Sequence, residues 1–61
     1  MKRRDLIRHL EKNGCPLKRE GVSHSIHWNP ATGKREPVPR HREIPDLLVR
    51  KICIALDIPQ P

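Results

Sequence analysis

Four histidines are the residues of this chain best suited to chemistry near neutral pH, and they lie among many arginines. They are His9, His24, His27 and His41, in 61 residues that include 13 Lys and Arg against 7 Asp and Glu. An unperturbed imidazole has a pKa of about 6.5, so it can take or give a proton near neutral pH. A neighbouring Lys or Arg can stabilise negative charge developing on a phosphate. The combination suits cleavage of RNA, whose own 2′-hydroxyl is the nucleophile.

Other kinds of site find little support in the sequence. No carboxylate pair, glycine-rich nucleotide loop or cluster of metal ligands stands out. Cys15 and Cys53 are far apart and form no Cys-x-x-Cys pair, so we expect buried thiols and no zinc. A serine triad needs a built pocket, for which so short a chain leaves little room. We therefore expect no metal and no small-molecule cofactor.

The formal net charge of +6 points to a polyanionic partner, because arginine forms paired hydrogen bonds with phosphate. Trp28 is the single aromatic residue, which disfavours binding of RNA on an aromatic platform and leaves contacts to phosphates and 2′-hydroxyls. Neither a signal peptide nor a stretch of about 18 apolar residues is found. We expect a cytoplasmic protein without a membrane span.

Two helices are predicted, one near each end of the chain. The first runs from Lys2 to Asn13, and Gly14 suits the left-handed residue that closes a helix. The second runs from Ile44 to Leu56, with Pro45 near its first turn and a short non-helical tail after it. The apolar stripes are Leu6, Ile7 and Leu10 in the first helix, and Ile44, Leu48, Ile52, Ala55 and Leu56 in the second.

Three short strands are predicted between the helices. In the first strand, Cys15, Leu17 and Arg19 occupy every second position, and we expect their side chains to face the core. The third runs from Lys34 to Pro39, and Pro37 places it at a sheet edge. The resulting order, α-β-β-β-α, predicts an α+β fold in which two helices cover one face of a three-stranded antiparallel sheet. This architecture is compatible with a double-stranded-RNA-binding-like fold.

The second predicted strand runs from Ser23 to Trp28 and carries the best catalytic candidate. Alternation places His24 on the face of Ile26 and points Ser25 and His27 outward. His24 lies at the beginning of the strand, beside a turn. A ring there can be partly desolvated and held in one orientation while it still touches substrate. The other three histidines are expected at the surface.

The run from Lys18 to Ile26 resembles the signature of the HicA family of bacterial toxins, in which a Gly-Ser-His strand motif carries the active histidine. The likeness continues through Asn-Pro-Ala-Thr-Gly at 29–33 and Val-Pro-Arg-His at 38–41. It includes the basic opening at 1–7, Asn13-Gly14, and the closing segment at 48–58. It extends over essentially the whole chain, which we interpret as one HicA-like domain, residues 1–61.

This resemblance implies a double-stranded-RNA-binding-like fold, ribonuclease activity on messenger RNA and a HicB-type antitoxin that covers the site. The family's active histidine falls on His24, with Gly21 and Ser23 shaping the entry to its strand. No metal is needed for this chemistry. The RNA-binding residues expected near it are Lys18, Arg19, Ser23, Arg40 and His41.

Two positions depart from the family's pattern. Val22 stands where a glycine usually precedes Ser-His, and His27 stands where an aromatic residue often follows the strand's isoleucine. The alternatives to a toxin are an inactive HicA-like protein and a non-catalytic RNA-binding module that uses the same basic surface. A DNA-associated regulator is less well supported, because strands separate the two predicted helices and leave no helix-turn-helix pair.

Overall fold

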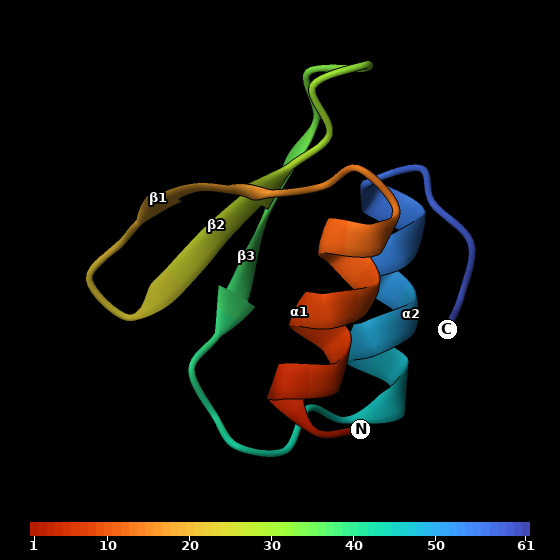
Figure 1. Ribbon diagram of the computed structural model, residues 1–61. Helices are drawn as coiled ribbons and strands as arrows, with labels where there is room; N and C mark the ends of the chain where they lie inside the picture. The colour runs from red at the N-terminus through yellow and green to blue at the C-terminus, as the bar shows by residue number, and fades with distance from the viewer.

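A computed structural model describes all 61 residues of the chain. The elements are α1 (Arg3–Lys12), β1 (Leu17–Glu20), β2 (His24–Trp28), β3 (Arg35–Pro39) and α2 (Asp46–Ala55). The strands form one antiparallel sheet in the order β1-β2-β3. The two helices lie side by side, and one apolar core joins them to the sheet (Figure 1). The predicted α-β-β-β-α fold is confirmed.

Helix α1 forms as its apolar spacing predicts. Leu6 and Leu10 are one turn apart and both are fully buried. No side chain caps the first turn; instead the backbone N–H of Arg3 donates to the carbonyl of Arg42 at 2.9 Å. Gly14 has a φ of +80°, the left-handed conformation that a glycine adopts without strain. The end of α1 was therefore predicted correctly.

Helix α2 is shorter than predicted, and its inward stripe agrees with the prediction in part: Ile44, Ile52 and Leu56 are buried as predicted. It begins after Pro45, which confirms the proline's place at the helix start. Its buried residues are Val49, Ile52 and Cys53, whereas Leu48 and Ala55 are only half-buried. Neither α1 nor α2 has the length and apolar content needed to cross a lipid bilayer.

The core lies between the helices and the sheet. Both cysteines belong to it as free thiols, as the sequence predicted. Burial raises the pKa of both, and the nearby Cys15 adds to the rise at Cys53. The nine core residues are Leu6, Leu10, Cys15, Val38, Ile44, Val49, Ile52, Cys53 and Leu56.

Strand β2 faces the opposite way from the prediction. Ser25 and His27 were expected to point outward, but each is 1% exposed. Ser25 pairs with the core residue Val38, so this side of the sheet is the one that the helices cover. Buried polar groups need partners, and His27 has one: its Nδ1–H donates to the carbonyl of Cys15 at 2.9 Å. His24 consequently lies on the open face of the sheet.

The two edge strands also differ from each other. All four residues of β1 are exposed, so the prediction that Leu17 and Arg19 face the core was wrong. An irregularity in pairing between these two residues interrupts the alternation, and Cys15, which precedes the strand, is the residue that reaches the core. Strand β3 forms the other edge, as predicted, and Pro37 and Pro39 give it two positions without an N–H donor.

Candidate functional site

His24 is the first residue of β2, on the face of the sheet that the helices leave open. Its side chain is half-buried, and its backbone pairs with Pro39 of β3. The hydroxyl of Ser23 lies 3.0 Å from Nδ1 of the imidazole. This contact orients the ring through Nδ1, and no other protein group bonds the ring. Nε2 is therefore available to a ligand on the open face.

The turn before His24 is tight because of Gly21. The N–H of Gly21 donates to the carbonyl of His24 at 2.7 Å. A Cβ on Gly21 would lie 3.0 Å from that same oxygen, so any larger residue would push against the backbone of His24. Val22 is fully exposed, and Asp57 is the only non-glycine residue with a positive φ. Position 22 thus does not require the glycine that the family usually has there.

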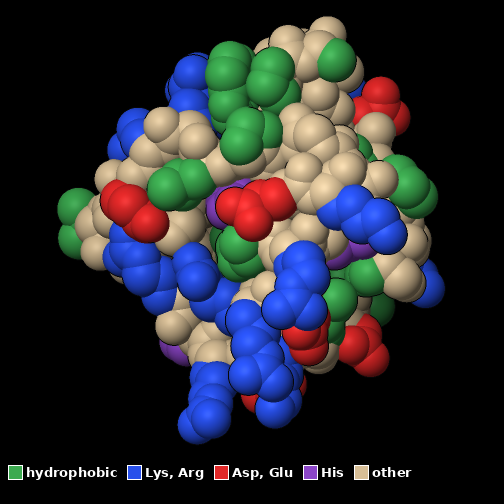
Figure 2. All heavy atoms as spheres, in the orientation of Figure 1, with side chains coloured by type: hydrophobic (Ala, Val, Ile, Leu, Met, Phe, Trp, Pro, Cys, Tyr) green, Lys and Arg blue, Asp and Glu red, His purple; other side chains and the backbone are tan.

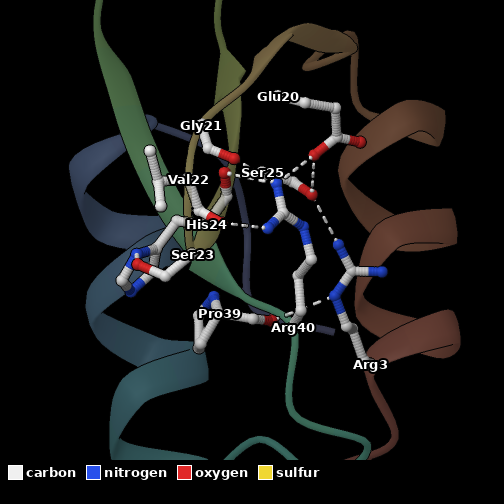
Figure 3. Close-up of polar contacts among 9 residues, drawn as sticks. All are labelled: Arg3, Glu20, Gly21, Val22, Ser23, His24, Ser25, Pro39 and Arg40. Atoms are coloured by element: carbon white, nitrogen blue, oxygen red, sulfur yellow. Dashed lines mark hydrogen bonds and ion pairs between the residues drawn. The ribbon is translucent and has the colours of Figure 1, made fainter.

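Arg40 holds this turn from the far end of β3 (Figure 3). Its Nη1 donates to the carbonyl of Val22 at 2.9 Å. Its Nη2 lies 2.6 Å from the carbonyl of Gly21 and 3.1 Å from that of His24. The same nitrogen contacts the carboxylate of Glu20 at 2.8 Å. The guanidinium that we expected to bind RNA is thus engaged with the backbone that carries His24.

A relay of polar side chains continues from Glu20 to α1 (Figure 3). The hydroxyl of Ser25 donates to Glu20 at 2.7 Å, and Nη2 of Arg3 donates to that hydroxyl at 2.7 Å. Nε of Arg3 donates to the carbonyl of Pro39 at 3.0 Å. The hydrogen bond from Arg40, then that from Ser25, lowers the pKa of the Glu20 carboxyl, and the charges of Arg40 and Arg3 add to the effect.

This relay could not be predicted from the sequence. Arg3, Glu20 and Ser25 are far apart in the chain or belong to different elements, and no local pattern links them. The sequence shows only that a glutamate, Glu20, lies beside the predicted turn and that an arginine, Arg40, follows the third predicted strand. Their pairing depends on the register that brings Pro39 opposite His24, which is a property of the folded sheet.

The other predicted site residues lie in two places. Lys18 and Arg19 belong to β1; Arg19 pairs with Ile26 on the open face, and Nζ of Lys18 lies 3.8 Å from the centre of the Trp28 ring. Ser23 is exposed beside His24, and His41 is exposed in the loop after β3. The structure thus brings Lys18 and Arg19 to the face that carries His24. No three His, Cys, Asp or Glu side chains are grouped so as to hold a metal ion.

The remaining histidines have structural contacts. Nε2–H of His9 donates to the carbonyl of Pro59 at 2.7 Å, which ties the C-terminal tail to α1. His27 is buried, as described above. Of the four imidazoles, His24 and His41 are the two with no bond to a distant part of the chain.

One known family model matches almost the whole chain. Residues 3–58 match the family model described as "HicA toxin of bacterial toxin-antitoxin". The chain belongs to the HicA toxin family. The match includes both helices, the whole sheet and the turn that precedes His24. A comparison with curated proteins found no match, and neither did one with solved structures.

Proposed function

We propose that this HicA-family protein is an endoribonuclease toxin that cleaves messenger RNA through His24 and is neutralised by a HicB-type antitoxin. One observation carries the proposal. The imidazole of His24 is oriented through Nδ1 by Ser23 and lies half-buried on the uncovered face of the sheet. An oriented imidazole with a free Nε2 is what general base catalysis requires.

The reaction needs few protein groups. Nε2 of His24 takes the proton of a ribose 2′-hydroxyl, and the 2′-oxygen forms a bond to the adjacent phosphorus. The bond from phosphorus to the 5′-oxygen breaks, and solvent protonates that oxygen. The products are a 2′,3′-cyclic phosphate and a 5′-hydroxyl end. Lys18 and Arg19, on the same face, hold the phosphates of the substrate.

The test is cleavage of purified RNA in the presence of EDTA. Wild-type protein is expected to cleave, since no step uses a metal. His24→Ala should lower the rate by about 10²–10⁴-fold, the usual contribution of a general base. His9→Ala is the matched control, because it removes an imidazole whose contact is with the tail rather than the site. It should cleave at the wild-type rate.

The alternative is a non-catalytic RNA-binding module on the same basic face. RNA that stays intact with the wild-type protein, although it is bound tightly, would support this alternative. Equal cleavage by wild type and His24→Ala would also contradict our proposal. In either case the affinity for RNA is expected to fall steeply with salt, because phosphates supply most of the contacts.

The antitoxin is expected to cover the open face. Ile26 and Trp28 are half-buried there beside Lys18 and Arg19, so an acidic partner with an apolar centre would complement the face. Expression of this chain alone should arrest bacterial growth, and co-expression of a neighbouring reading frame should relieve the arrest. Arrest that persists in His24→Ala would separate toxicity from cleavage and contradict the mechanism.

A further inference from the structure

A second basic feature lies outside the candidate site. A small hollow of about 100 Å³ opens at the N-terminal end of α1, and every residue that lines it is basic. Figure 2 shows Lys and Arg side chains gathered over this end of α1 and the loop that follows β3. The lining residues are Lys2, Arg3, Arg4 and Arg42. We propose that this hollow binds a backbone phosphate of the RNA, away from the phosphate that is cleaved.

Two of the four basic side chains in the hollow, Lys2 and Arg42, have no acidic partner, and Arg3 reaches Glu20 only through the hydroxyl of Ser25. Asp5 approaches Arg4 only at 4.0 Å, and no acidic side chain lies within ion-pair distance of Lys2 or Arg42. Glu43 and Asp46 are close by, but they contact the N-terminal ammonium at 3.7 and 3.6 Å. Like charges gathered without counter-charges repel one another, so a bound anion would relieve this repulsion.

The chemistry of the hollow favours a phosphate over an acidic protein segment. No hydrophobic residue lines it, whereas protein interfaces usually have an apolar centre. Arginine guanidinium groups match the geometry of phosphate oxygens. One of them is already fixed: Arg3 is held by the hydroxyl of Ser25 and the carbonyl of Pro39. Holding the side chain in place lowers the entropy that binding would otherwise cost.

The fold links the hollow to His24 through one short segment. Pro39 pairs with His24 and accepts the hydrogen bond from Arg3. Arg40, His41 and Arg42 follow it directly in the chain. RNA that has its scissile phosphate at His24 would therefore cross this loop, beside the exposed His41, to reach the hollow. The inference rests on the proposed function for the choice of RNA as ligand, and it makes the substrate longer than a dinucleotide.

The experiment measures RNA binding in a background that does not cleave. In His24→Ala protein, Lys2→Ala and Arg42→Ala are combined, which leaves Arg3 and its relay intact. The control combines Arg50→Ala and Lys51→Ala, which removes the same charge from an exposed part of α2 without an ion pair. Binding of a single-stranded RNA of about ten nucleotides is followed by fluorescence anisotropy over a range of salt concentrations.

The variant with Lys2→Ala and Arg42→Ala is expected to bind RNA about tenfold more weakly at low salt. The slope of the logarithm of the binding constant against the logarithm of the salt concentration should fall by about 1 in magnitude, because the counterions of about one phosphate are no longer released on binding. The control should keep the slope. Equal losses in the two variants would mean that only the overall field matters and would overturn the proposal. The proposal would also be overturned if the variant with Lys2→Ala and Arg42→Ala kept its affinity for RNA but lost binding of polyglutamate. That result would assign the hollow to an acidic protein. Because His24 is absent throughout, these outcomes do not depend on whether it is catalytic.

Discussion

The two faces of β2 each carry a histidine, and the two side chains have opposite surroundings. His27 lies on the covered face, 1% exposed, with its Nδ1–H bonded to the carbonyl of Cys15. His24 lies on the open face, half-buried, and the only hydrogen bond of its ring is with the adjacent Ser23. The same residue type thus stabilises the fold on one side and is free to meet a ligand on the other. Neither role can be assigned to an imidazole without knowing which way its strand faces.

The neighbours of the two histidines differ as well. On the covered face Ser25 is fully bonded, and no buried side-chain polar atom in the molecule lacks a partner. On the open face Ile26 and Trp28 remain half-buried, next to Lys18 and Arg19. Strand β2 therefore places its polar Ser25 and His27 inside and its apolar Ile26 and Trp28 outside, the reverse of the usual pattern. This reversal is what a sheet needs if its outer face is to be covered by a partner.

The largest expected contrast comes from the two histidines themselves. His27→Ala should lower the free energy of unfolding by about 3 kcal/mol, because it leaves a cavity and an unpaired Cys15 carbonyl. A domain of this size has about 3–5 kcal/mol in all, so urea unfolding should show a protein that retains only about 0–2 kcal/mol of stability. His27→Gln, which keeps a donor, should recover part of the loss. His24→Ala should unfold like the wild type; a loss as large as that of His27→Ala would remove the distinction between the faces.

Gly21→Ala should disturb the turn through which the chain enters β2. The added Cβ would press on the carbonyl of His24, so the turn must shift. We expect a loss of about 1–2 kcal/mol in urea unfolding and about tenfold slower RNA cleavage by the folded protein. The control is Val22→Ala, since this neighbouring side chain is fully exposed. Equal cleavage rates in the two variants would mean that the turn does not position His24.

The relay of polar side chains that begins at Glu20 should make the free energy of unfolding depend on pH. The pKa of Glu20 is lowered in the folded state, chiefly by its hydrogen bond with Arg40. Its contribution is therefore present above the pKa of an unfolded glutamate and is lost as the pH falls through the lowered folded value. Glu20→Gln should be less stable than wild type at neutral pH, and the difference should vanish in acid. A difference that persists at low pH would show that charge is not its source.

The smallest expected effect is that of Val22→Gly, which restores the family's usual residue. The backbone at position 22 has no positive φ, so glycine gains nothing in the folded state. It adds freedom to the unfolded chain, which should lower stability by about 0.4–1 kcal/mol in thermal unfolding. RNA cleavage should change less than twofold. A large gain in cleavage would mean that Val22 hinders the open face.

The sequence predicted the order of elements well because its signals there are local. Gly14 ends α1, Pro45 begins α2, and Pro37 lies on an edge strand, as expected from backbone chemistry alone. Membership of the HicA family was also visible in the run from Lys18 to Ile26, and the family match confirmed it.

The facing of β2 could not be predicted in the same way. Ile26 and Trp28 are more apolar than Ser25 and His27, so alternation alone favours the wrong side. The covered face accepts the polar pair because distant groups satisfy them: Arg3 of α1 for Ser25, and the carbonyl of Cys15 for His27. The role of Arg40 is likewise set by pairing of β3 with β2. Its contact with RNA, like those of Lys18, Arg19, Ser23 and His41, stays a prediction.

The prolines of β3 have a consequence for self-association. Pro37 and Pro39 offer no N–H to an incoming strand, so the sheet resists extension on that side. Only the β1 side can grow. Two molecules that paired through their β1 strands would have no further edge strand able to pair, so they would form a closed dimer. A fibre requires two pairing edges in each molecule. The fold is thereby protected from polymerising through the backbone of its sheet.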